Sequence, residues 1–277
     1  MSQSGPTSYK IGSFEVVRHI AQGSDAAIYE VLCPQTGQRR AMKLSSRPEI
    51  HLQRLQRTYE ALDRLSHPNI IQVHSMATTD DGRPFLILDL VDGVPAQVHA
   101  KSLGPAGTPA RTEAVVTIGI QLAEALAYLH AHDMVHRDIK SANVLVEPDG
   151  RTQLIDFGSA LFPGTSQPPK ADFIGTYTYA PPEQIKGHPV SPESDIYAMG
   201  VLLYRLLSGV RPFQADTAAE VARMHLEAQP VPLCDRLTDL PAHIGALVGQ
   251  MMAKQTTDRP RSASEVATAL RGGGQAG

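Results

Sequence analysis

The stretch from Met134 to Gly158 constrains the chain more than any other part of its sequence. Two short hairpin-like segments here carry Asp138, Asn143 and Asp156, and Lys140 lies two positions after the first of them. Carboxylate and amide oxygens suit a hard cation such as Mg²⁺, and a carboxylate can also accept a proton. The stretch therefore predicts a site that handles protons, metal ions or both.

Composition limits the kinds of partner. The chain has 277 residues, 19% charged and 42% hydrophobic, with a net charge of −3. These are ordinary values for a globular protein and give no basic surplus for nucleic acid or an anionic membrane. The longest apolar run, around Tyr197 to Leu207, is too short and interrupted to cross a bilayer. We expect no nucleic-acid partner, no membrane segment and a cytoplasmic location.

The two cysteines, Cys33 and Cys234, lie far apart and form no CxxC motif. This spacing excludes a disulfide framework and a cysteine-rich zinc site, and it fits a reducing compartment. The sequence also begins without an apolar signal region.

Periodicity predicts a small first lobe over residues 14–92, after a flexible tail at 1–13. Strand-like runs are expected at Phe14–Ile20, Ala27–Leu32, Arg39–Leu44, Ile70–His74 and Phe85–Leu90. A helix is expected after Pro48, with an apolar stripe at Leu52, Leu55, Tyr59, Leu62 and Leu65.

A mainly helical second lobe is predicted over residues 93–270, followed by a flexible tail at 271–277. Amphipathic patterns indicate helices after Thr108-Pro109 and at 217–228, 244–253 and 263–270, and 196–207 reads as a buried helix. The fold class is therefore α+β, with two lobes.

Ordered motifs along the chain support a resemblance. They are Ala41-Met42-Lys43, His67-Pro68-Asn69-Ile70, His136 to Asn143 (HRDIKSAN), Asp156-Phe157-Gly158, Gly175 to Glu183, Asp195 to Gly200, Arg211-Pro212-Phe213 and Asp258-Arg259-Pro260. Each motif is weak alone, but the ordered set is specific. From Phe14 to Leu270 the chain resembles Hanks-type protein kinases, and it is most similar to the bacterial serine/threonine branch.

The resemblance implies roles for the central stretch, with ATP and Mg²⁺ bound between the lobes and Mn²⁺ as an alternative ion. Asp138 would orient or accept the proton of a substrate hydroxyl, and Lys140 would lie near the γ-phosphoryl group. Asn143 and Asp156 would hold the metal. His136 is expected to be a core residue against Phe157.

The resemblance also assigns an ATP pocket. Lys43 would reach the α- and β-phosphates, and Ala41 would lie over the adenine. The other expected contacts are Ile20, Gly23, Ile28, Leu145, Leu88 as the gatekeeper, and the main chain of Asp89 and Val91. The apolar members of this set are equally good core residues.

The glycine-rich loop departs from the family pattern. Where the family has three glycines, this chain has Ala21, Gly23 and Ala26. Glycine lets backbone N–H groups approach a phosphate closely, and alanine adds one methyl group and disfavours positive φ. We expect weaker or more selective nucleotide binding.

The first helix departs further. The family's glutamate partner for the strand lysine falls at Thr58, and Glu60 is turned by about 200° from that position and should face solvent. Three alternatives stay open: the helix shifts its register, another acid such as Asp156 pairs with Lys43, or the enzyme is weak.

The segment from Asp156 to Glu183 would form the activation loop and the substrate platform. Thr176 matches the threonine that contacts Asp138 and Lys140 in serine/threonine kinases. Glu183 and Arg259 would form a buried ion pair, and Asp195 would accept backbone N–H bonds from the catalytic loop. Arg137 before Asp138 suggests control by loop phosphorylation, for which Thr165 and Ser166 are the candidates, although both fit an ordinary loop equally well.

The sequence predicts a kinase that transfers the γ-phosphoryl group of Mg·ATP to serine or threonine of a protein, with autophosphorylation in a homodimer as a further expectation. One alternative is a pseudokinase that acts as a binding or scaffold module. Another is a small-molecule kinase, which Lys140 and the Gly175–Glu183 platform argue against because a small substrate needs no peptide shelf.

Overall fold

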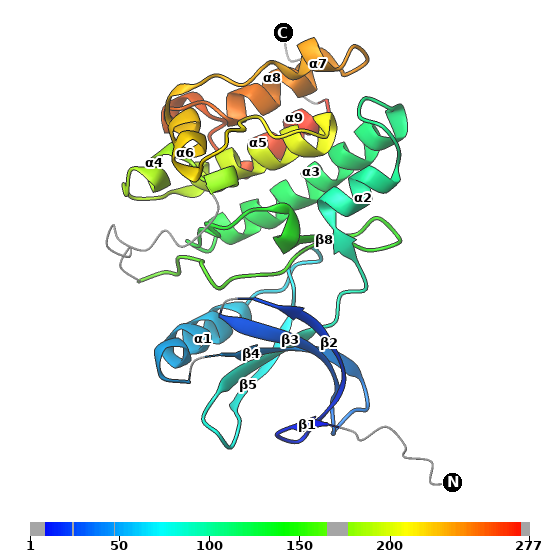
Figure 1. Ribbon diagram of the computed structural model, residues 1–277, viewed down its shortest axis with the longest axis vertical. Helices are drawn as coiled ribbons and strands as arrows, with labels where there is room; N and C mark the ends of the chain where they lie inside the picture. The colour runs from blue at the N-terminus through cyan, green and yellow to red at the C-terminus, as the bar shows by residue number, and fades with distance from the viewer. Residues whose placement is uncertain (1–8, 24, 47, 165–176, 273–277) are drawn as a thin grey trace. The chain divides into compact units, whose positions relative to one another are not determined.

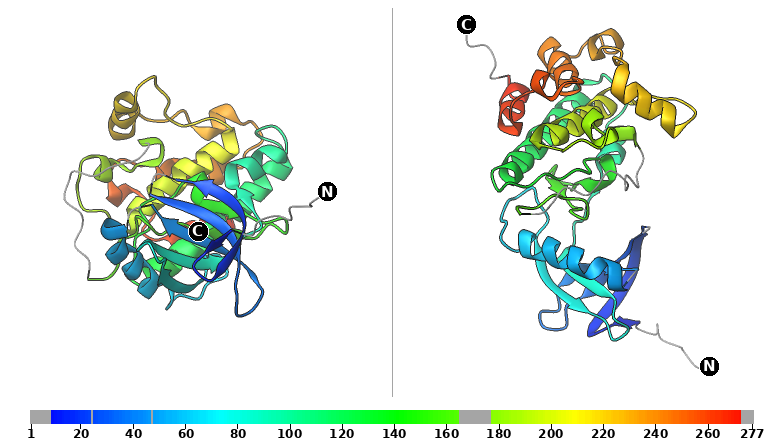
Figure 2. Two further views of the ribbon diagram at one scale, coloured as in Figure 1. Left: turned by 60° about the horizontal axis from the view of Figure 1, so that its bottom comes forward. Right: turned by 90° about the vertical axis from the view of Figure 1, so that its left-hand side faces the viewer.

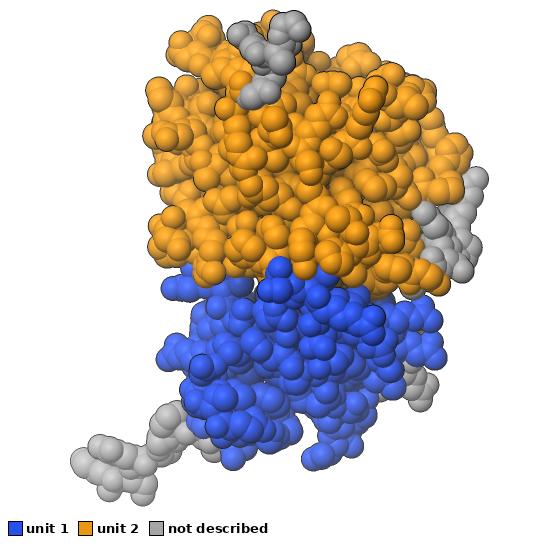
Figure 3. Space-filling model, turned by 180° about the vertical axis from the view of Figure 1, so that it is seen from behind, with its two compact units in different colours: residues 1–66, 71–92 blue, residues 67–70, 93–277 orange. Residues whose placement is uncertain are grey.

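The chain divides into two compact units (Figure 3). The computed structural model describes residues 9–23, 25–46, 48–164 and 177–272. The first unit comprises the described residues up to Ser66 together with 71–92, and the second comprises 67–70 and the described residues from Gly93 onward. The chain thus passes from one unit to the other after Asp92, and the short segment 67–70 groups with the second unit.

The first unit is built on a six-stranded antiparallel sheet in the order β1-β2-β3-β4-β6-β5 (Figure 1). Its strands are β1 (Lys10–Ile11), β2 (Phe14–Gln22), β3 (Ala26–Leu32), β4 (Arg39–Ser45), β5 (Val73–Thr78) and β6 (Pro84–Asp89). The meander β2-β3-β4 agrees with the three runs predicted from the sequence. The tight turn at Gly37, with φ of 68°, joins β3 to β4.

The ordered sheet begins before Phe14. Lys10 pairs with Glu15 and Ile11 with Phe14, so the last residues of the predicted flexible tail form strand β1 and a turn. Ile11 is 4% exposed and joins the apolar core on one face of the sheet, and this burial explains why the segment is fixed. The other core members are Phe14, Val31, Met42, Leu44, Phe85 and Ile87.

Helix α1 (Pro48–Leu62) packs against β5 and β6. Thr58 is buried, and its hydroxyl donates to the Arg54 carbonyl at 2.9 Å. Glu60 is exposed and accepts a hydrogen bond from Gln56. Thr58 therefore takes the inward position and Glu60 the solvent position, as the sequence predicts. Leu52 is exposed, so the apolar stripe starts later than predicted.

The prediction of a strand at Ile70–His74 places the start of the strand too early. Strand β5 begins at Val73, and Ile70 instead forms a parallel bridge with Leu154 of the second unit. The Leu154 amide donates to the Asn69 carbonyl at 2.9 Å. Pairing outside the local strand thus overrides the β propensity of Ile70 and Ile71.

The second unit is mainly helical, and α5 (Pro192–Ser208) runs through it in contact with α2, α3, α7 and α8 (Figures 1 and 2). The helix begins with Pro192 at its first position and ends at Gly209, whose φ is 77°. Its other elements are α2 (Ala96–Ser102), α3 (Pro109–His130), α4 (Pro182–Ile185), α6 (Ala218–Glu227), α7 (Leu233–Arg236), α8 (Ala242–Met251), α9 (Ala263–Leu270) and the 3₁₀ turns η1 (Ser141–Asn143), η2 (Tyr177–Tyr179) and η3 (Thr256–Asp258).

Helix α3 is the described helix that is long and apolar enough to cross a membrane by length and composition alone. Core helices of globular proteins meet the same criteria. Here α3 packs against α5 and α9, and Val115, Ile118 and Leu122 are among its buried residues. The prediction of no membrane segment stays a prediction.

A small second sheet lies in the helical unit. Strands β7 (Val94–Pro95), β8 (Val144–Val146) and β9 (Thr152–Leu154) pair antiparallel in that order. The hairpin β8–β9 agrees with the hairpin-like character predicted for the central stretch. The hairpin fixes the positions of the residues just before β8 and just after β9, which form part of the candidate site.

Candidate active site

The β8–β9 hairpin brings Asn143 and Asp156 together. Asn143 comes directly before β8, and Asp156 follows β9 after a single residue. Val144 pairs with Leu154, and the Ile155 amide donates to the Asn143 carbonyl at 3.0 Å. The two oxygen-bearing side chains therefore extend from the same end of one hairpin.

Asp138 is held from two sides. Lys140 Nζ lies 2.7 Å from its Oδ2, and Asn143 Nδ2 donates to the same oxygen at 2.9 Å and to the Asp138 carbonyl at 2.8 Å. Asp138 and Lys140 are half-buried, and Asn143 is buried. The ammonium and the amide beside the carboxylate hold it in one orientation, as a group that accepts a substrate proton requires.

The loop that carries Asp138 rests on Asp195 at the start of α5. The Asp195 carboxylate accepts bonds from the backbone amides of His136 and Arg137, both at 2.8 Å, and from His130 Nε2 at 3.0 Å. Burial alone would raise the pKa of Asp195, but the bond and charge of His130 and the nearby His136 hold that pKa below its ordinary value. The predicted backbone bonds to Asp195 are present, and His130 is an additional partner that no motif in the sequence indicates.

Arg137 has a φ of 68°, in the left-handed region that costs a non-glycine residue about 1–2 kcal/mol. The bond from its amide to Asp195 offsets part of that cost. His136 is fully buried and packs edge-on against Phe157, with ring centroids 4.9 Å apart, as predicted. Burial lowers the pKa of His136, although the charges of Asp195, Asp138 and Asp156 oppose this. A neutral His136 fits a structural role.

The donor set suits a hard divalent ion. Both side-chain hydrogen bonds of Asn143 use Nδ2, which leaves its Oδ1 as a metal ligand. Asp156 accepts the Gly158 amide through Oδ1 at 3.0 Å, and this bond orients the carboxylate. Among the described residues, no group of three or more histidine, cysteine, aspartate or glutamate side chains forms a denser metal site. Two oxygen ligands from one hairpin fit Mg²⁺, which completes its coordination with waters and phosphates.

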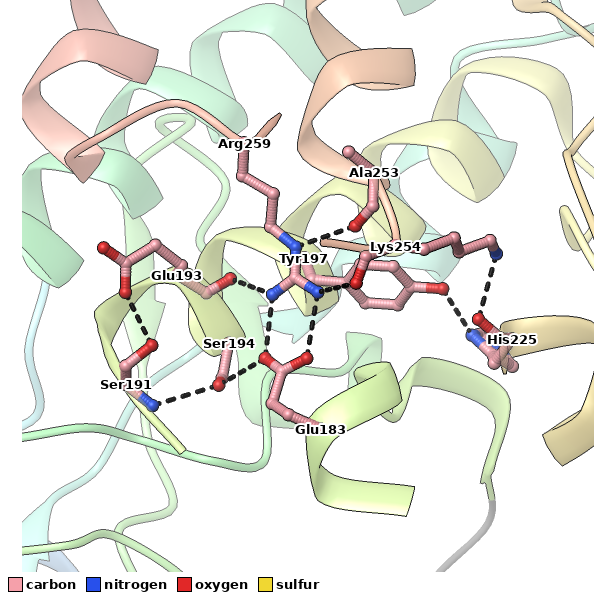
Figure 4. Close-up of polar contacts among 9 residues, drawn as sticks. All are labelled: Glu183, Ser191, Glu193, Ser194, Tyr197, His225, Ala253, Lys254 and Arg259. Carbon is pink, nitrogen blue, oxygen red and sulfur yellow. Dashed lines mark hydrogen bonds and ion pairs between the residues drawn. The ribbon is translucent and has the colours of Figure 1, made fainter. Parts of the chain in front are cut away.

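Beside this site, Glu183 and Arg259 form the predicted ion pair, shown in Figure 4. Glu183 lies at the start of α4, and its Oε1 also accepts a hydrogen bond from the Ser194 hydroxyl at 2.6 Å. Thr176, at the predicted contact with Asp138, lies outside the described residues, as do the candidate phosphorylation sites Thr165 and Ser166. The nearest described part of the predicted platform is η2, which begins at Tyr177.

In the first unit, strand register gathers the predicted nucleotide residues on one face of the sheet. Ile28 pairs with Lys43, and Ala41 pairs with Leu88. Cross-strand partners share a face, and so do Ala41 and Lys43, which are two residues apart on β4. The apolar core around Met42 and Leu44 occupies the opposite face. The pattern fits a nucleotide surface made of Ile28, Ala41, Lys43 and Leu88.

Other predicted nucleotide residues have weaker structural support. Ile20 on β2 is 39% exposed, and Gly23 closes the turn after β2 by donating to the Ala26 carbonyl at 2.9 Å. Val91 lies beyond β6, and Leu145 lies on β8 of the second unit. These observations leave their roles as predictions.

The carboxylate of Asp89 has partners that sequence reasoning missed. His74 Nε2 lies 2.7 Å from its Oδ1, and Arg40 Nη1 lies 3.5 Å away. Its amide donates to the Gln72 carbonyl at 3.0 Å. These contacts fix the end of β6, where the resemblance expects main-chain bonds to a nucleotide base. The pairing of β5 with β6 would indicate the contact between His74 and Asp89, but the sequence prediction placed the start of β5 too early.

A sheet unit with one helix, followed along the chain by a helical unit that carries Asp138, Asn143 and Asp156, is the architecture of protein kinases. A comparison with family models matches residues 14–269 to the protein kinase domain. The chain therefore belongs to the protein kinase family.

Bacterial relatives support the same assignment. Serine/threonine-protein kinase PknA of Mycobacterium tuberculosis is 32% identical over 269 residues, covering 94% of this chain and 61% of the relative. PkaA of Streptomyces coelicolor is 35% identical over 260 residues (90% and 45%), and PknB of Mycolicibacterium smegmatis is 33% identical over 229 residues (80% and 36%). The chain spans about three fifths or less of these relatives.

Proposed function

We propose that this chain is a serine/threonine protein kinase that transfers the γ-phosphoryl group of Mg·ATP to a protein hydroxyl. The observation that carries this proposal is the Asp138 carboxylate, held by Lys140 and Asn143 at 2.7 and 2.9 Å. The names of the bacterial relatives support serine and threonine as acceptors.

Each group of the site has a task in that reaction. Asp138 orients the acceptor hydroxyl and takes its proton as the hydroxyl oxygen forms a bond to the γ-phosphorus and the bond to the β,γ-bridging oxygen breaks, releasing ADP. Lys140 offsets negative charge beside the transferred group. Asn143 and Asp156 hold Mg²⁺, which when bound neutralises charge on the phosphates. Lys43 contributes a cation to the α- and β-phosphates.

A second candidate function is nucleotide binding with little or no transfer, as in a pseudokinase. Thr58 favours it, because the inward position of α1 carries a hydroxyl that bonds within the helix in place of a carboxylate. Ala21 near the end of β2 and Ala26 at the start of β3, which replace two glycines of the family's loop, favour it as well. The intact bonding of Asp138 favours the active enzyme.

The decisive experiment compares wild type with Asp138→Asn and Lys43→Met. Purified protein is incubated with Mg·ATP and a generic basic protein, and phosphorylated residues are mapped. Loss of a proton-accepting carboxylate is expected to lower the transfer rate by about 100-fold or more. Phosphoserine or phosphothreonine in the wild-type reaction alone supports the proposal.

Equal incorporation in wild type and Asp138→Asn would overturn this mechanism. A thermal shift with Mg·ATP and no transfer by wild type would support the pseudokinase. Transfer to other copies of the chain, which would show as phosphorylation that increases with protein concentration, tests the predicted autophosphorylation in a homodimer. The cytoplasmic location is a further proposal, which fractionation of the source cells would test.

A further inference from the structure

Helix α6 contacts both described parts of the predicted substrate platform. It packs against η2, which contains Thr178, and against α4, which contains Glu183. Thr178, two positions after Thr176 in the sequence, is 5% exposed. The position of the platform therefore depends on what holds α6 and η2 together.

His225 of α6 is fully buried among groups that fix its ring (Figure 4). Tyr197 Oη lies 2.9 Å from His225 Nδ1, and the Phe213 ring packs edge-on with centroids 4.7 Å apart. Lys254 Nζ donates to the His225 carbonyl at 2.9 Å and lies 4.4 Å from the centre of the Phe213 ring. The imidazole consequently has one orientation.

The surroundings also select one tautomer. Burial raises the pKa of the Tyr197 phenol, so its hydroxyl stays protonated and donates to Nδ1. Burial, followed by the charge of Lys254, lowers the pKa of His225 to about 4, so the ring is neutral near pH 7. With Nδ1 accepting, the single ring proton lies on Nε2.

The Nε2–H is the unexplained feature of this cluster. It is buried and has no hydrogen-bond partner of normal geometry among the described residues. A buried donor without a partner costs about 1–3 kcal/mol. The 3₁₀ turn η2, which contains Thr178, packs against α6. A backbone interaction with Thr178 opposes the lowering of the His225 pKa. A backbone group that favours the protonated ring is a carbonyl positioned to accept from it.

We propose that His225 is a positioning residue for the substrate platform, whose Nε2–H holds the Thr178 carbonyl and thereby sets the segment that follows Thr176. Tyr197 fixes the tautomer that makes this bond, and Lys254 fixes the end of α6 that carries the ring. The role of His225 in substrate recognition rests on the proposed kinase function. The hydrogen bond from His225 to Thr178 is independent of that function.

The first test is amide hydrogen exchange at residues 177–180 in the protein without nucleotide. Tyr197→Phe keeps the ring and removes the hydroxyl, and His225→Leu removes both ring nitrogens. His225→Leu is expected to exchange about three to ten times faster at these amides, because one buried hydrogen bond is lost. Tyr197→Phe, in which the ring proton can move to Nδ1, is expected to exchange faster than wild type by a smaller factor. His225→Gln carries an N–H donor of similar reach and is expected to exchange like wild type.

Tyr204→Phe is the matched control. Tyr204 lies on α5, as Tyr197 does, and is 1% exposed. Its hydroxyl donates to the Val231 carbonyl at 2.8 Å and accepts from Arg236 Nε at 2.7 Å. Its loss should leave residues 177–180 unchanged. Exchange in His225→Leu equal to that in wild type would overturn the proposal. Exchange in Tyr197→Phe equal to that in Tyr204→Phe would overturn the role of Tyr197 in selecting the tautomer.

The second test separates positioning from general damage. In Tyr197→Phe the KM for a protein substrate should rise about three- to tenfold, while the KM for ATP stays at the wild-type value. An equal rise in the KM for the protein substrate and the KM for ATP would contradict a positioning role. If wild type transfers no phosphate, the proposed function fails, and hydrogen exchange still decides whether His225 holds the platform segment.

Discussion

The guanidinium of Arg259 binds both carboxylate oxygens of Glu183, with N–O distances of 2.8 and 2.9 Å. Both side chains are buried, and Arg259 also donates to the carbonyls of Ala253 and Glu193. Burial alone would raise the pKa of Glu183, but the bonds and charge of Arg259 outweigh it and lower that pKa. The pair therefore joins the start of α4 to the segment after η3.

Removing the charge of Glu183 should be strongly destabilising. Glu183→Gln leaves the Arg259 cation buried without its carboxylate, which costs about 3–5 kcal/mol. The free energy of unfolding, measured by denaturant titration, is the readout. Glu124→Gln is the control, because Glu124 pairs with Arg271 at an exposed site and should cost about 1 kcal/mol or less. Equal losses in the two variants would contradict the assigned difference in burial.

Replacing Asp195 should loosen the catalytic loop. Asp195→Asn keeps one acceptor oxygen but turns an amide N–H₂ toward the donors of His136 and Arg137, so at least one charge-assisted bond is lost. We expect kcat to fall about tenfold or more with little change in the KM for ATP, since Asp195 supports Asp138 and touches no phosphate. Steady-state kinetics measure both constants.

Glu193→Gln provides the comparison for Asp195, since its carboxylate lies in the same first turn of α5 and accepts from the Ser191 hydroxyl. It should leave kcat near the wild-type value. A similar fall in kcat for both variants would mean that the start of α5, and not the contact with the loop, controls the rate.

The sequence predicted the two-unit fold and most of the central site because those residues act through short-range spacing. Asn143 and Asp156 flank a hairpin, so their proximity follows from local structure. Long-range partners without a motif were missed: His225 lies 28 residues from Tyr197, and a lone histidine on an amphipathic helix gives no signal. Helix α2 was missed because its buried face consists of only Ala96 and Ala100.

Acid should destabilise the fold through His225. Its pKa is about 4 in the folded protein and about 6.5 when unfolded. Between these values the unfolded chain binds a proton that the folded chain does not, so the free energy of unfolding falls as pH drops from 6.5 toward 4. Lys254 is the cation facing the ring and Tyr197 its titratable neighbour. His136, with a pKa also lowered by burial, acts in the same direction.

The contribution of His225 amounts to about 3 kcal/mol across that range. Denaturant titrations at several pH values measure it. His225→Gln should flatten the dependence on pH, whereas replacing the exposed His243 by Gln should not. An unchanged slope in His225→Gln would contradict the assignment of this histidine as neutral and buried.

Thr58 offers the sharpest test of the nucleotide-binding side. Thr58 is 5% exposed and lies on the inward face of α1, at the position where the family resemblance places an acid partner for Lys43. Thr58→Glu adds that carboxylate, and a charge-assisted bond to Lys43 should raise kcat/KM for Mg·ATP about tenfold or more. Thr58→Gln, of equal size but neutral, should give no such gain.

The gain in Thr58→Glu must also depend on Lys43, so Lys43→Met in the same background should remove it. If the carboxylate does not meet Lys43, it is buried without a partner, and Thr58→Glu becomes less stable than Thr58→Gln with no gain in activity. That result would exclude a missing acid at position 58 as the cause of weak activity and would leave Ala21 and Ala26 as the departures to restore to glycine. Parallel kinetic and denaturation measurements on the two variants distinguish these outcomes.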